Sequence, residues 1–264
     1  MSLVIAAKSE ARKEFARAVL SRFADAIPGG PILVKPNVVS PEPYPTTTHP
    51  DLLSAVLEYY AGRELTVADA AAADLVRPGK ALREHPLAEV CRAHGRELLD
   101  LYDHPMTKLK APSGVALTMS ELPLKSSAIV SLPVLKSHVQ CLMTGALKNH
   151  FGFLPRRERG RLHCGRGDIH QAIASLHQLA PVSLVIMDAV ITEINANEIR
   201  HGGKPAPLGY LLAATDPVAL DAFALSLLQT VEPKLHGLSP REIPYLRYAA
   251  EWGVGSLQYE LEWI

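Results

Sequence analysis

The stretch AIVSLPVLKSHVQCLMTGALKNHFGFLPRRERGRLHCGRGDIHQAIASL (residues 128–176) contains the unit that decides the fold. Residues 128–133 are a short apolar run of strand length that leads directly into a basic region. Asp168 then precedes a helical pattern over 169–179, in which apolar side chains return every three or four residues. His177 lies on a different stripe of this helix, so we expect it at a surface or an interface. A strand followed by a capped helix is the repeating unit of an α/β fold.

The same alternation continues on both sides of this unit. Short strands are expected at 32–34, 65–69, 98–102, 183–189 and 210–215. Helical patterns fall at 50–62, 81–94 and 218–228. Strands that are separated by helices pair in parallel and carry helices on both faces of the sheet. We therefore predict an α/β fold with a mostly parallel sheet, layered αβα.

Two segments lack this regularity. Residues 156–167 and 193–208 show neither a strand nor a helix pattern, which is typical of lids and insertions. A chain of 264 residues is long enough for one large domain. We predict a single α/β domain over residues 1–264 with an irregular basic loop insertion, and a lid or subdomain at about 150–168 and 193–208.

Composition indicates an ordinary globular protein. Of the 264 residues, 48% are hydrophobic and 20% charged, and 27 basic residues balance 27 acidic ones. The pI near 7.2 argues against bulk binding to nucleic acid or to an anionic membrane. The first residues lack the apolar core of a signal peptide, and no later segment approaches the roughly 20 apolar residues of a membrane span. We expect a cytoplasmic protein, and the sequence leaves open whether it forms a homo-oligomer.

Cysteine usage narrows the cofactor classes. Cys91, Cys141 and Cys164 lie far apart and include no C-x-x-C spacing. This pattern argues against a disulfide framework, and against an iron–sulfur cluster or a four-cysteine zinc site ligated by this chain alone. Cys141 precedes the arginine run and Cys164 falls within it, and we expect Cys141 to be a buried, inert thiol.

Residues 133–170 carry a local excess of positive charge. Five arginines and two lysines stand against Glu158 and Asp168, so the segment carries 7 − 2 = +5 in a chain of net charge +0. Four of the 11 histidines also fall here. Such a concentration within a neutral protein indicates a site for an anion. For the arginine run over 156–166, a solvated basic loop is the alternative interpretation.

Polar side chains end several of the predicted strands. Ligands of open α/β sheets bind at the carboxyl ends of the strands, so these side chains are expected to meet at one edge. Lysines there would neutralise a carboxylate or a phosphate, and asparagines would orient it. Arginines from the basic run would close over the ligand as a mobile rim. The predicted substrate-binding residues are Lys35, Asn37, Lys136, Lys148, Asn149, Arg161 and Arg166.

Histidines supply the predicted chemistry. His138 or His163 would serve as general acid or base, because histidine titrates near neutral pH, and Asp188 would orient the base. The same three residues are the candidates for a divalent metal site whose ligands come from different elements. The H-E-x-x-H and H-x-H spacings of compact metal motifs are absent. The cofactor therefore stays unknown at this stage.

Several segments together closely resemble the domain of unknown function family 362 (DUF362). They are ILVKPNVVSPEPYPTTTHPDLLSAV (32–56), IVSLPVLKSHVQCLMTGALKNHFGFLP (129–155), LHCGRGDIHQAIASL (162–176), VIMDAVITEI (185–194) and LLAATDPVALDAFALSLL (211–228). The resemblance implies an α/β core. Many members also carry a ferredoxin-like module with cysteine-ligated iron–sulfur clusters, which this sequence lacks. The chain departs from the family in a longer polar insert at 195–207. A more distant likeness, to the nickel-pincer lactate racemase group, rests on lysines and histidines at the edge of an α/β sheet.

These observations support two functional hypotheses. The first is an enzyme that binds a small anionic substrate, a carboxylate or a phosphate, at the carboxyl edge of the sheet. The second is a non-catalytic protein that holds a metal or metallocofactor through His138, His163 and a carboxylate. Such a protein would be related to iron–sulfur or redox partners. RNA binding through the arginine run is the weaker interpretation, because base-stacking aromatic residues are scarce there.

Overall fold

A computed structural model describes residues 1–264 and places most of the strands in one mixed sheet of ten strands. The order across this sheet is β12-β1-β11-β10-β7-β2-β3-β4, and β8 pairs with β10 and β9. β5 and β6 form a separate two-stranded sheet. The strands are β1 Ser2–Lys8, β2 Ile32–Pro36, β3 Leu65–Asp69, β4 Leu98–Asp100, β5 Met106–Lys110, β6 Ala116–Ser120, β7 Ala128–Leu132, β8 Val134–His138, β9 Leu142–Thr144, β10 Leu184–Ile194, β11 Lys204–Ala214 and β12 Tyr259–Trp263.

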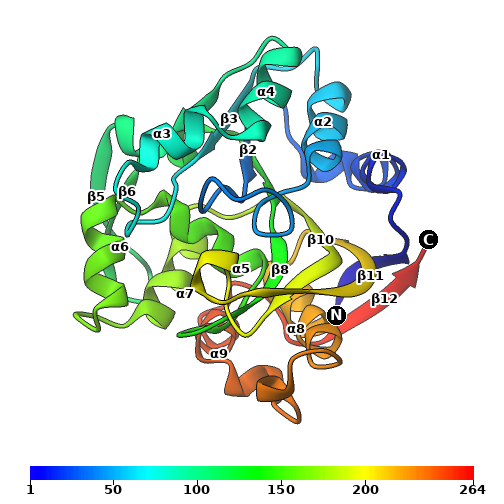
Figure 1. Cartoon of the computed structure of the whole chain (residues 1–264), viewed down its shortest axis with the longest axis vertical. Helices are drawn as coiled ribbons and strands as arrows, with labels where there is room; N and C mark the ends of the chain where they lie inside the picture. Colours follow the sequence, from blue (N-terminus) through cyan, green and yellow to red (C-terminus); the bar gives the residue numbers. More distant parts are fainter.

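Helices cover both faces of the large sheet (Figure 1). One apolar core lies under α1, α2 and α4 and contains Phe15 and Leu53. The other lies under α5, α7, α8 and α9 and contains Ile173 and Tyr245. The predicted αβα layering is therefore confirmed. The helices are α1 Arg12–Arg22, α2 Pro50–Tyr59, α3 Pro78–Arg83, α4 Pro86–Ala93, α5 Ala146–Asn149, α6 Arg156–His163, α7 Ile169–Leu179, α8 Pro217–Leu228 and α9 Pro244–Glu251.

The sheet combines a run of parallel strands with antiparallel pairs, and its edge strand β12 pairs in parallel with β1. β2 pairs in parallel with β3 and β7, β3 with β4, and β7 with β10. β10 pairs antiparallel with β11, which pairs antiparallel with β1. The expectation of an irregular segment over 193–208 is wrong in part, because β10 and β11 each extend to 11 residues and include both ends of that segment. No α-helix separates these two strands, so a short connection joins them and they pair antiparallel.

The basic segment that was expected to be an irregular loop forms a helix over most of its length. α6 spans Arg156–His163 and follows Pro155 at its N-terminus. Arginine, glutamate and leucine are good helix formers, but the dense charge hides the apolar periodicity, because Leu162 is the only buried apolar side chain of the helix. A carboxylate oxygen of Glu158 accepts a hydrogen bond from the backbone N–H of Thr118 at 3.0 Å, which ties α6 to the β5–β6 hairpin.

His177 is buried, so its predicted surface position is wrong. Its ring stacks on that of His150 with centroids 3.9 Å apart and an angle of 2° between the planes. The burial arises because α7 packs both against α9 and against the turn that begins at His150. None of the helices combines the length and the apolar character that a membrane crossing needs.

Candidate functional site

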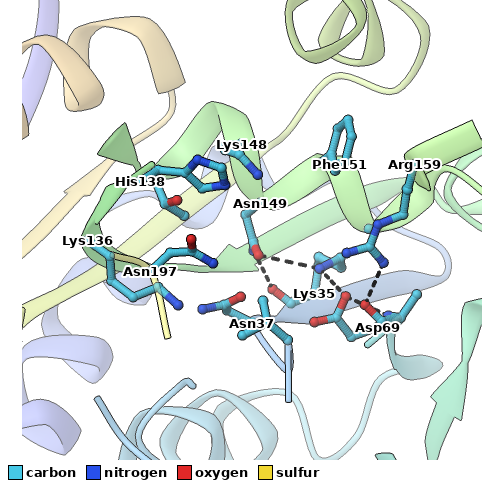
Figure 2. Close-up of a pocket in the computed structure, with 14 residues that line it drawn as sticks. Lys35, Asn37, Asp69, Lys136, His138, Lys148, Asn149, Phe151, Arg159 and Asn197 are labelled. Carbon is cyan, nitrogen blue, oxygen red and sulfur yellow. Dashed lines mark hydrogen bonds and ion pairs between the residues drawn. The ribbon is translucent and has the colours of Figure 1, made fainter. Parts of the chain in front are cut away.

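The carboxyl ends of β2, β3 and β8 meet α5 around a small space, here named the floor cavity (Figure 2). Its volume of about 40 Å³ has room for a few atoms. A larger space of about 710 Å³, here named the outer cleft, adjoins it and shares His138, Lys148, Arg159 and Asn197 with it. Five of the seven predicted substrate-binding residues line the floor cavity: Lys35, Asn37, Lys136, Lys148 and Asn149.

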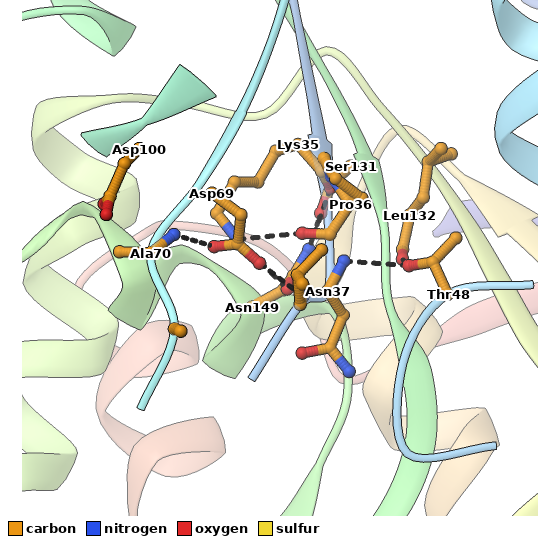
Figure 3. A network of polar contacts seen from close by, with 12 residues as sticks. Lys35, Pro36, Asn37, Thr48, Asp69, Ala70, Asp100, Ser131, Leu132 and Asn149 are labelled. Carbon is orange, nitrogen blue, oxygen red and sulfur yellow. Dashed lines mark hydrogen bonds and ion pairs between the residues drawn. The ribbon is translucent and has the colours of Figure 1, made fainter. Parts of the chain in front are cut away.

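Lys35 at the end of β2 is held in a buried ion pair (Figure 3). Its Nζ lies 2.5 Å from Oδ1 of Asp69 and donates to the carbonyl of Pro36 at 2.9 Å. The Asp69 carboxylate also accepts backbone N–H groups from Val38 at 2.5 Å and Ala70 at 2.7 Å. Burial lowers the pKa of Lys35, and the Asp69 charge opposes this shift. Because its charge is already matched by a buried carboxylate, Lys35 holds the site together rather than offering a free charge.

Asn149 links three of the elements that form the site. Its side-chain amide donates to the carbonyl of Lys35 at 3.1 Å and to the hydroxyl of Ser131, in β7, at 2.9 Å. Gly152 follows closely, and a Cβ there would lie 2.7 Å from a carboxylate oxygen of Asp69. A side chain at position 152 would therefore force the Lys35–Asp69 pair to shift.

Lys136 in β8 is fully buried but has no carboxylate partner. Its side chain is 0% exposed, and its Nζ forms one hydrogen bond, to the carbonyl of Thr46 at 2.6 Å. An ammonium group has three N–H donors, so two remain without a protein partner beside the floor cavity. Burial lowers the pKa of Lys136, and the negative charge of Glu193 opposes the shift most strongly. The hydroxyl of Thr144, which also lines this cavity, is likewise buried without a partner.

His138 ends β8 and has a fixed tautomer. Its Nδ1 accepts the backbone N–H groups of Gln140 and Cys141, both at 3.1 Å. Backbone N–H groups can only donate, so in the neutral ring Nδ1 carries the lone pair and Nε2 carries the proton. Burial and the charge of Lys148 hold the pKa of His138 well below its usual value. At neutral pH His138 therefore presents an Nε2–H donor, and its Nε2 is not available to accept a proton.

Lys148 lies at the junction of the floor cavity and the outer cleft. It is half-buried, and its Nζ sits 4.8 Å from the centre of the Phe151 ring and forms no hydrogen bond or ion pair with the protein. Burial lowers the pKa of Lys148 to about 8, and the positive charges of Arg159 and Lys136 add to the shift. At pH 7 Lys148 is therefore mostly an ammonium, but a small rise in pH is enough to convert it to the neutral amine.

Arg159 was not singled out from the sequence, although it lines both spaces. Its guanidinium donates to the carbonyls of Ala70 and Ala71, each at 2.9 Å, and to the hydroxyl of Tyr102 at 2.7 Å. Asp69 and Asn197 also line the floor cavity. A polar residue at the end of the 65–69 strand was a usable signal for Asp69. Arg159 and Asn197 depend on how α6 and the 195–203 connection fold back, which the local sequence does not encode.

Several predicted site residues lie elsewhere. Asp188 is buried against Arg12, whose Nε lies 2.5 Å from its carboxylate, and it accepts a hydrogen bond from Tyr44 at 2.8 Å. It therefore orients no histidine of the site. Arg161 and Arg166 are exposed, line neither space and interact with one another, through a hydrogen bond from the Arg161 guanidinium to the carbonyl of Arg166.

His163 is brought to the rim of the outer cleft rather than to the floor cavity. Its ring lies 6.1 Å from that of His138 and nearly parallel to it, and its Nδ1 lies 2.9 Å from the side-chain oxygen of Gln140. Partial desolvation, with a smaller contribution from the charge of Lys148, lowers the pKa of His163 to about 4. His163 is therefore neutral at pH 7.

The residues present do not fit a protein-held divalent metal, nickel included. No group of three or more His, Cys, Asp or Glu side chains gathers anywhere in the chain in a way that could hold one. The proposed set of His138, His163 and Asp188 fails because Asp188 is paired with Arg12 and Nδ1 of His138 already accepts two N–H groups. The site is instead rich in cations, which oppose metal binding.

Comparison with known proteins gives a distant curated relative and two structural neighbours. The chain is 29% identical over 150 residues to the thylakoid-associated protein sll1697 of Synechocystis, a match that covers 55% of this chain and 43% of that protein. The lactate racemase apoprotein of Thermoanaerobacterium thermosaccharolyticum superposes with a TM-score of 0.53 at 12% identity, covering 84% of this chain and 56% of the racemase. A protein of Thermotoga maritima gives a TM-score of 0.43 at 10% identity, over 83% of this chain and 57% of that one. The chain thus spans less than half of the curated relative and little more than half of the racemase.

The racemase likeness shows that the αβα architecture occurs in a solved structure. A family model described as a domain of unknown function, DUF362, matches residues 32–226. This range contains every lysine, histidine and asparagine that lines the floor cavity, and it covers well over half of the sequence. The chain therefore belongs to the DUF362 family.

Proposed function

We propose that this protein is an enzyme whose substrate is a small carboxylate, bound in the floor cavity with its charge against Lys136. The observation that carries the proposal is the state of the Lys136 ammonium, which is fully buried with one hydrogen bond and no ion pair. No carboxylate lies within ion-pair distance of this buried ammonium, and the charge of Glu193 acts on it only from further away, so a bound anion would stabilise it.

The neighbouring groups complete a site for a carboxylate with a second oxygen function. His138 offers its Nε2–H as a neutral donor, and Asn37 is buried at the same cavity. Lys148 adds a second cation, or a base when it is neutral. Because the floor cavity has room for only a few atoms, it suits a carboxylate head better than a large polyanion.

The structural neighbour agrees with this choice of substrate class. It is a lactate racemase by name, and lactate is a small 2-hydroxy carboxylate. The shared fold places the carboxyl ends of several strands at one edge, where α/β proteins bind their ligands. The carboxylate assignment for this chain rests on the lysines and histidine of its own cavity.

Calorimetric titration with sodium lactate tests the proposal, with sodium acetate and inorganic phosphate as comparison ligands. Lys136→Met keeps most of the side-chain volume and removes the charge. We expect it to weaken lactate binding by about 10- to 100-fold, since a hydrogen bond to a charged group contributes about 1.5–3 kcal/mol.

Arg161→Ala and Arg166→Ala are the matched controls, because both arginines are exposed and line neither space. They should bind lactate with unchanged affinity. Equal affinity of the unaltered protein and the Lys136→Met variant would overturn the proposal, as would tighter binding of phosphate than of any carboxylate.

A further inference from the structure

We propose that Lys148 is a nucleophile that forms an imine with the carbonyl carbon of a 2-oxo acid. This inference rests on the proposed function, because it assigns the carboxylate of the same substrate to Lys136. It goes further by naming the reactive group of the substrate and the bond that forms. The three lysines that line the floor cavity differ in their partners.

Only one of these lysines is free to react. Nζ of Lys35 is held by Asp69 at 2.5 Å and by the Pro36 carbonyl at 2.9 Å. Nζ of Lys136 donates to the Thr46 carbonyl at 2.6 Å and lies in the floor. Nζ of Lys148 has neither a hydrogen bond nor an ion pair, and it borders a cleft wide enough to admit a ligand.

The surroundings of Lys148 favour its neutral form. Phe151 presents its ring 4.8 Å from Nζ, and the Arg159 guanidinium lies 5.6 Å from the same ring. No carboxylate forms an ion pair with the amine, and the charge of Glu198 acts on it more weakly than those of Arg159 and Lys136. Partial desolvation beside other cations is a recognised way to prepare a lysine for Schiff-base chemistry. With a pKa of about 8, about a tenth of Lys148 is neutral at pH 7, far more than for an exposed lysine.

The neighbouring donors match the remaining groups of a 2-oxo acid. Lys136 has two unused N–H groups for the carboxylate. His138, which lines both spaces with Lys148, has an Nε2–H that can donate to the carbonyl oxygen and so draw electrons from the carbonyl carbon (Figure 2). A substrate with adjacent carboxylate and carbonyl groups would therefore engage all three side chains at once.

The step balances without a further reactant. The lone pair of neutral Lys148 Nζ attacks the carbonyl carbon, and the carbonyl π electrons move to oxygen beside the Nε2–H of His138. Both protons of the amine then pass to that oxygen, the C–O bond breaks, and one water leaves as the C=N bond forms. No oxidant or reductant takes part, and the imine can be reversed by water.

Reductive trapping tests the inference on the full chain. The protein is incubated with pyruvate and sodium cyanoborohydride, digested and mapped by mass spectrometry. The expected result is one reduced pyruvate adduct on Lys148, formed at least about tenfold faster than on the exposed Lys108, Lys110 and Lys234, because the pKa of Lys148 is lowered to about 8 and its Nζ borders the binding space. Excess lactate should slow the labelling, and Lys136→Met should reduce it.

Lys148→Arg keeps a positive charge and cannot form the imine. The rapidly formed adduct should therefore be absent from this variant, and no other lysine should be labelled rapidly in its place. Circular dichroism of each variant confirms that it has folded. Labelling of Lys148 no faster than of the exposed lysines would overturn the inference. If lactate still binds in a Lys136-dependent way, the proposed function stands and only the imine is lost; if lactate does not bind, both fail.

Discussion

At the residue scale, Lys35 and Lys136 are buried to the same extent but differ in their partners, and the partners determine what each charge contributes. Both are about equally buried, at 1% and 0% exposure. Lys35 pairs with Asp69, whereas Lys136 donates to one carbonyl, which also accepts the side-chain amide of Asn37 at 3.2 Å. The first lysine stabilises the fold, and the second is the one to which we assign the proposed ligand.

This difference predicts that the same substitution costs more stability at Lys35 than at Lys136. Lys35→Met leaves the Asp69 carboxylate buried without a counter-charge, so the free energy of unfolding should fall by about 3–5 kcal/mol. Lys136→Met breaks no ion pair and the Thr46 carbonyl keeps the Asn37 partner, but the buried Glu193 carboxylate loses the nearby positive charge, so the free energy of unfolding should fall by only about 1–2 kcal/mol. Urea unfolding of both variants measures this, and similar losses in the two would contradict it.

The proposed function predicts that carboxylate binding depends on pH through Lys148. The ammonium form attracts the anion, and burial has lowered its pKa to about 8. As the pH rises through that value the charge is lost, so lactate affinity should fall about tenfold between pH 7 and pH 9. Titration calorimetry at several pH values gives the profile.

Lys148→Met is the control for this profile. It should bind lactate more weakly at pH 7, with an affinity that changes little up to pH 9. A variant whose affinity fell as steeply as that of the unaltered protein would show that another group titrates.

At the element scale, the sequence indicates the floor of the site better than its walls. Lys35, Asn37 and His138 end or follow strands and Lys136 lies within β8, and parallel strands bring their carboxyl ends together wherever the helices lie. Lys148 and Asn149 come a few residues after β9 and stay close for the same reason. Side chains that reach the site from a folded-back element, such as Arg159, depend on tertiary packing that no local pattern encodes.

The difference between residues at strand ends and residues on folded-back elements also explains why Asp188 and Arg161 were wrongly expected in the site. Asp188 ends an apolar run as Lys35 does, but β10 continues past it, so Asp188 meets Arg12 instead of the cavity. In α6 the arginines are spaced around a helix, so Arg159 turns inward while Arg161 turns to solvent. Charge alone does not tell which face of such a helix is buried.

Arg200 holds the connection between β10 and β11 in place beside the outer cleft, because it contacts residues that line this cleft. Arg200 contacts Asp74 at 2.9 Å and the buried carboxylate of Glu198 at 2.6 Å, and its backbone N–H donates to Glu42. This holds Asn197 at the floor cavity. The insert that departs from the family pattern is therefore part of the site wall.

Arg200→Ala should loosen this connection without unfolding the protein, because Glu198 loses its ion pair while the β10–β11 pairing stays intact. Thermolysin, which cuts before apolar residues such as Ile199, should then cleave the variant several times faster. Lys204→Ala, an exposed position in β11, is the control. Equal cleavage rates in Arg200→Ala and the unaltered protein would show that other contacts hold the insert.

At the scale of the whole molecule, the two faces of the sheet differ in the residues that they bury. The core under α1, α2 and α4 contains residues such as Phe15 and Leu53, whereas the core on the other face lies beside α5, which carries Lys148, and beside the stacked pair His150 and His177. Both ring nitrogens of His150 and Nδ1 of His177 are buried without partners. The face that supports the site thus contains uncharged histidines that acid would protonate.

These histidines should make the protein sensitive to mild acid. Burial lowers the pKa of His177 to about 4 and holds that of His150 well below its usual value, and neighbouring positive charge opposes protonation of His150 further. The unfolded chain binds a proton at each histidine near pH 6.5, so the unfolded state gains protons first and stability is lost as the pH falls below that value. From His177 alone the loss between pH 6.5 and pH 4 is about 3 kcal/mol, because one pKa unit corresponds to about 1.4 kcal/mol.

The double variant His150→Leu/His177→Leu isolates this contribution from the other acid-sensitive groups. It removes both titrating rings and keeps an apolar side chain at each position, so the free energy of unfolding should decline less steeply from pH 6.5 to pH 4 than in the unaltered protein, whatever its value at pH 7. Urea unfolding at half-unit pH intervals measures the two slopes. Parallel slopes would mean that the stacked pair is already protonated in the folded state or is not buried, and the acid sensitivity would then belong to His138 and the carboxylates.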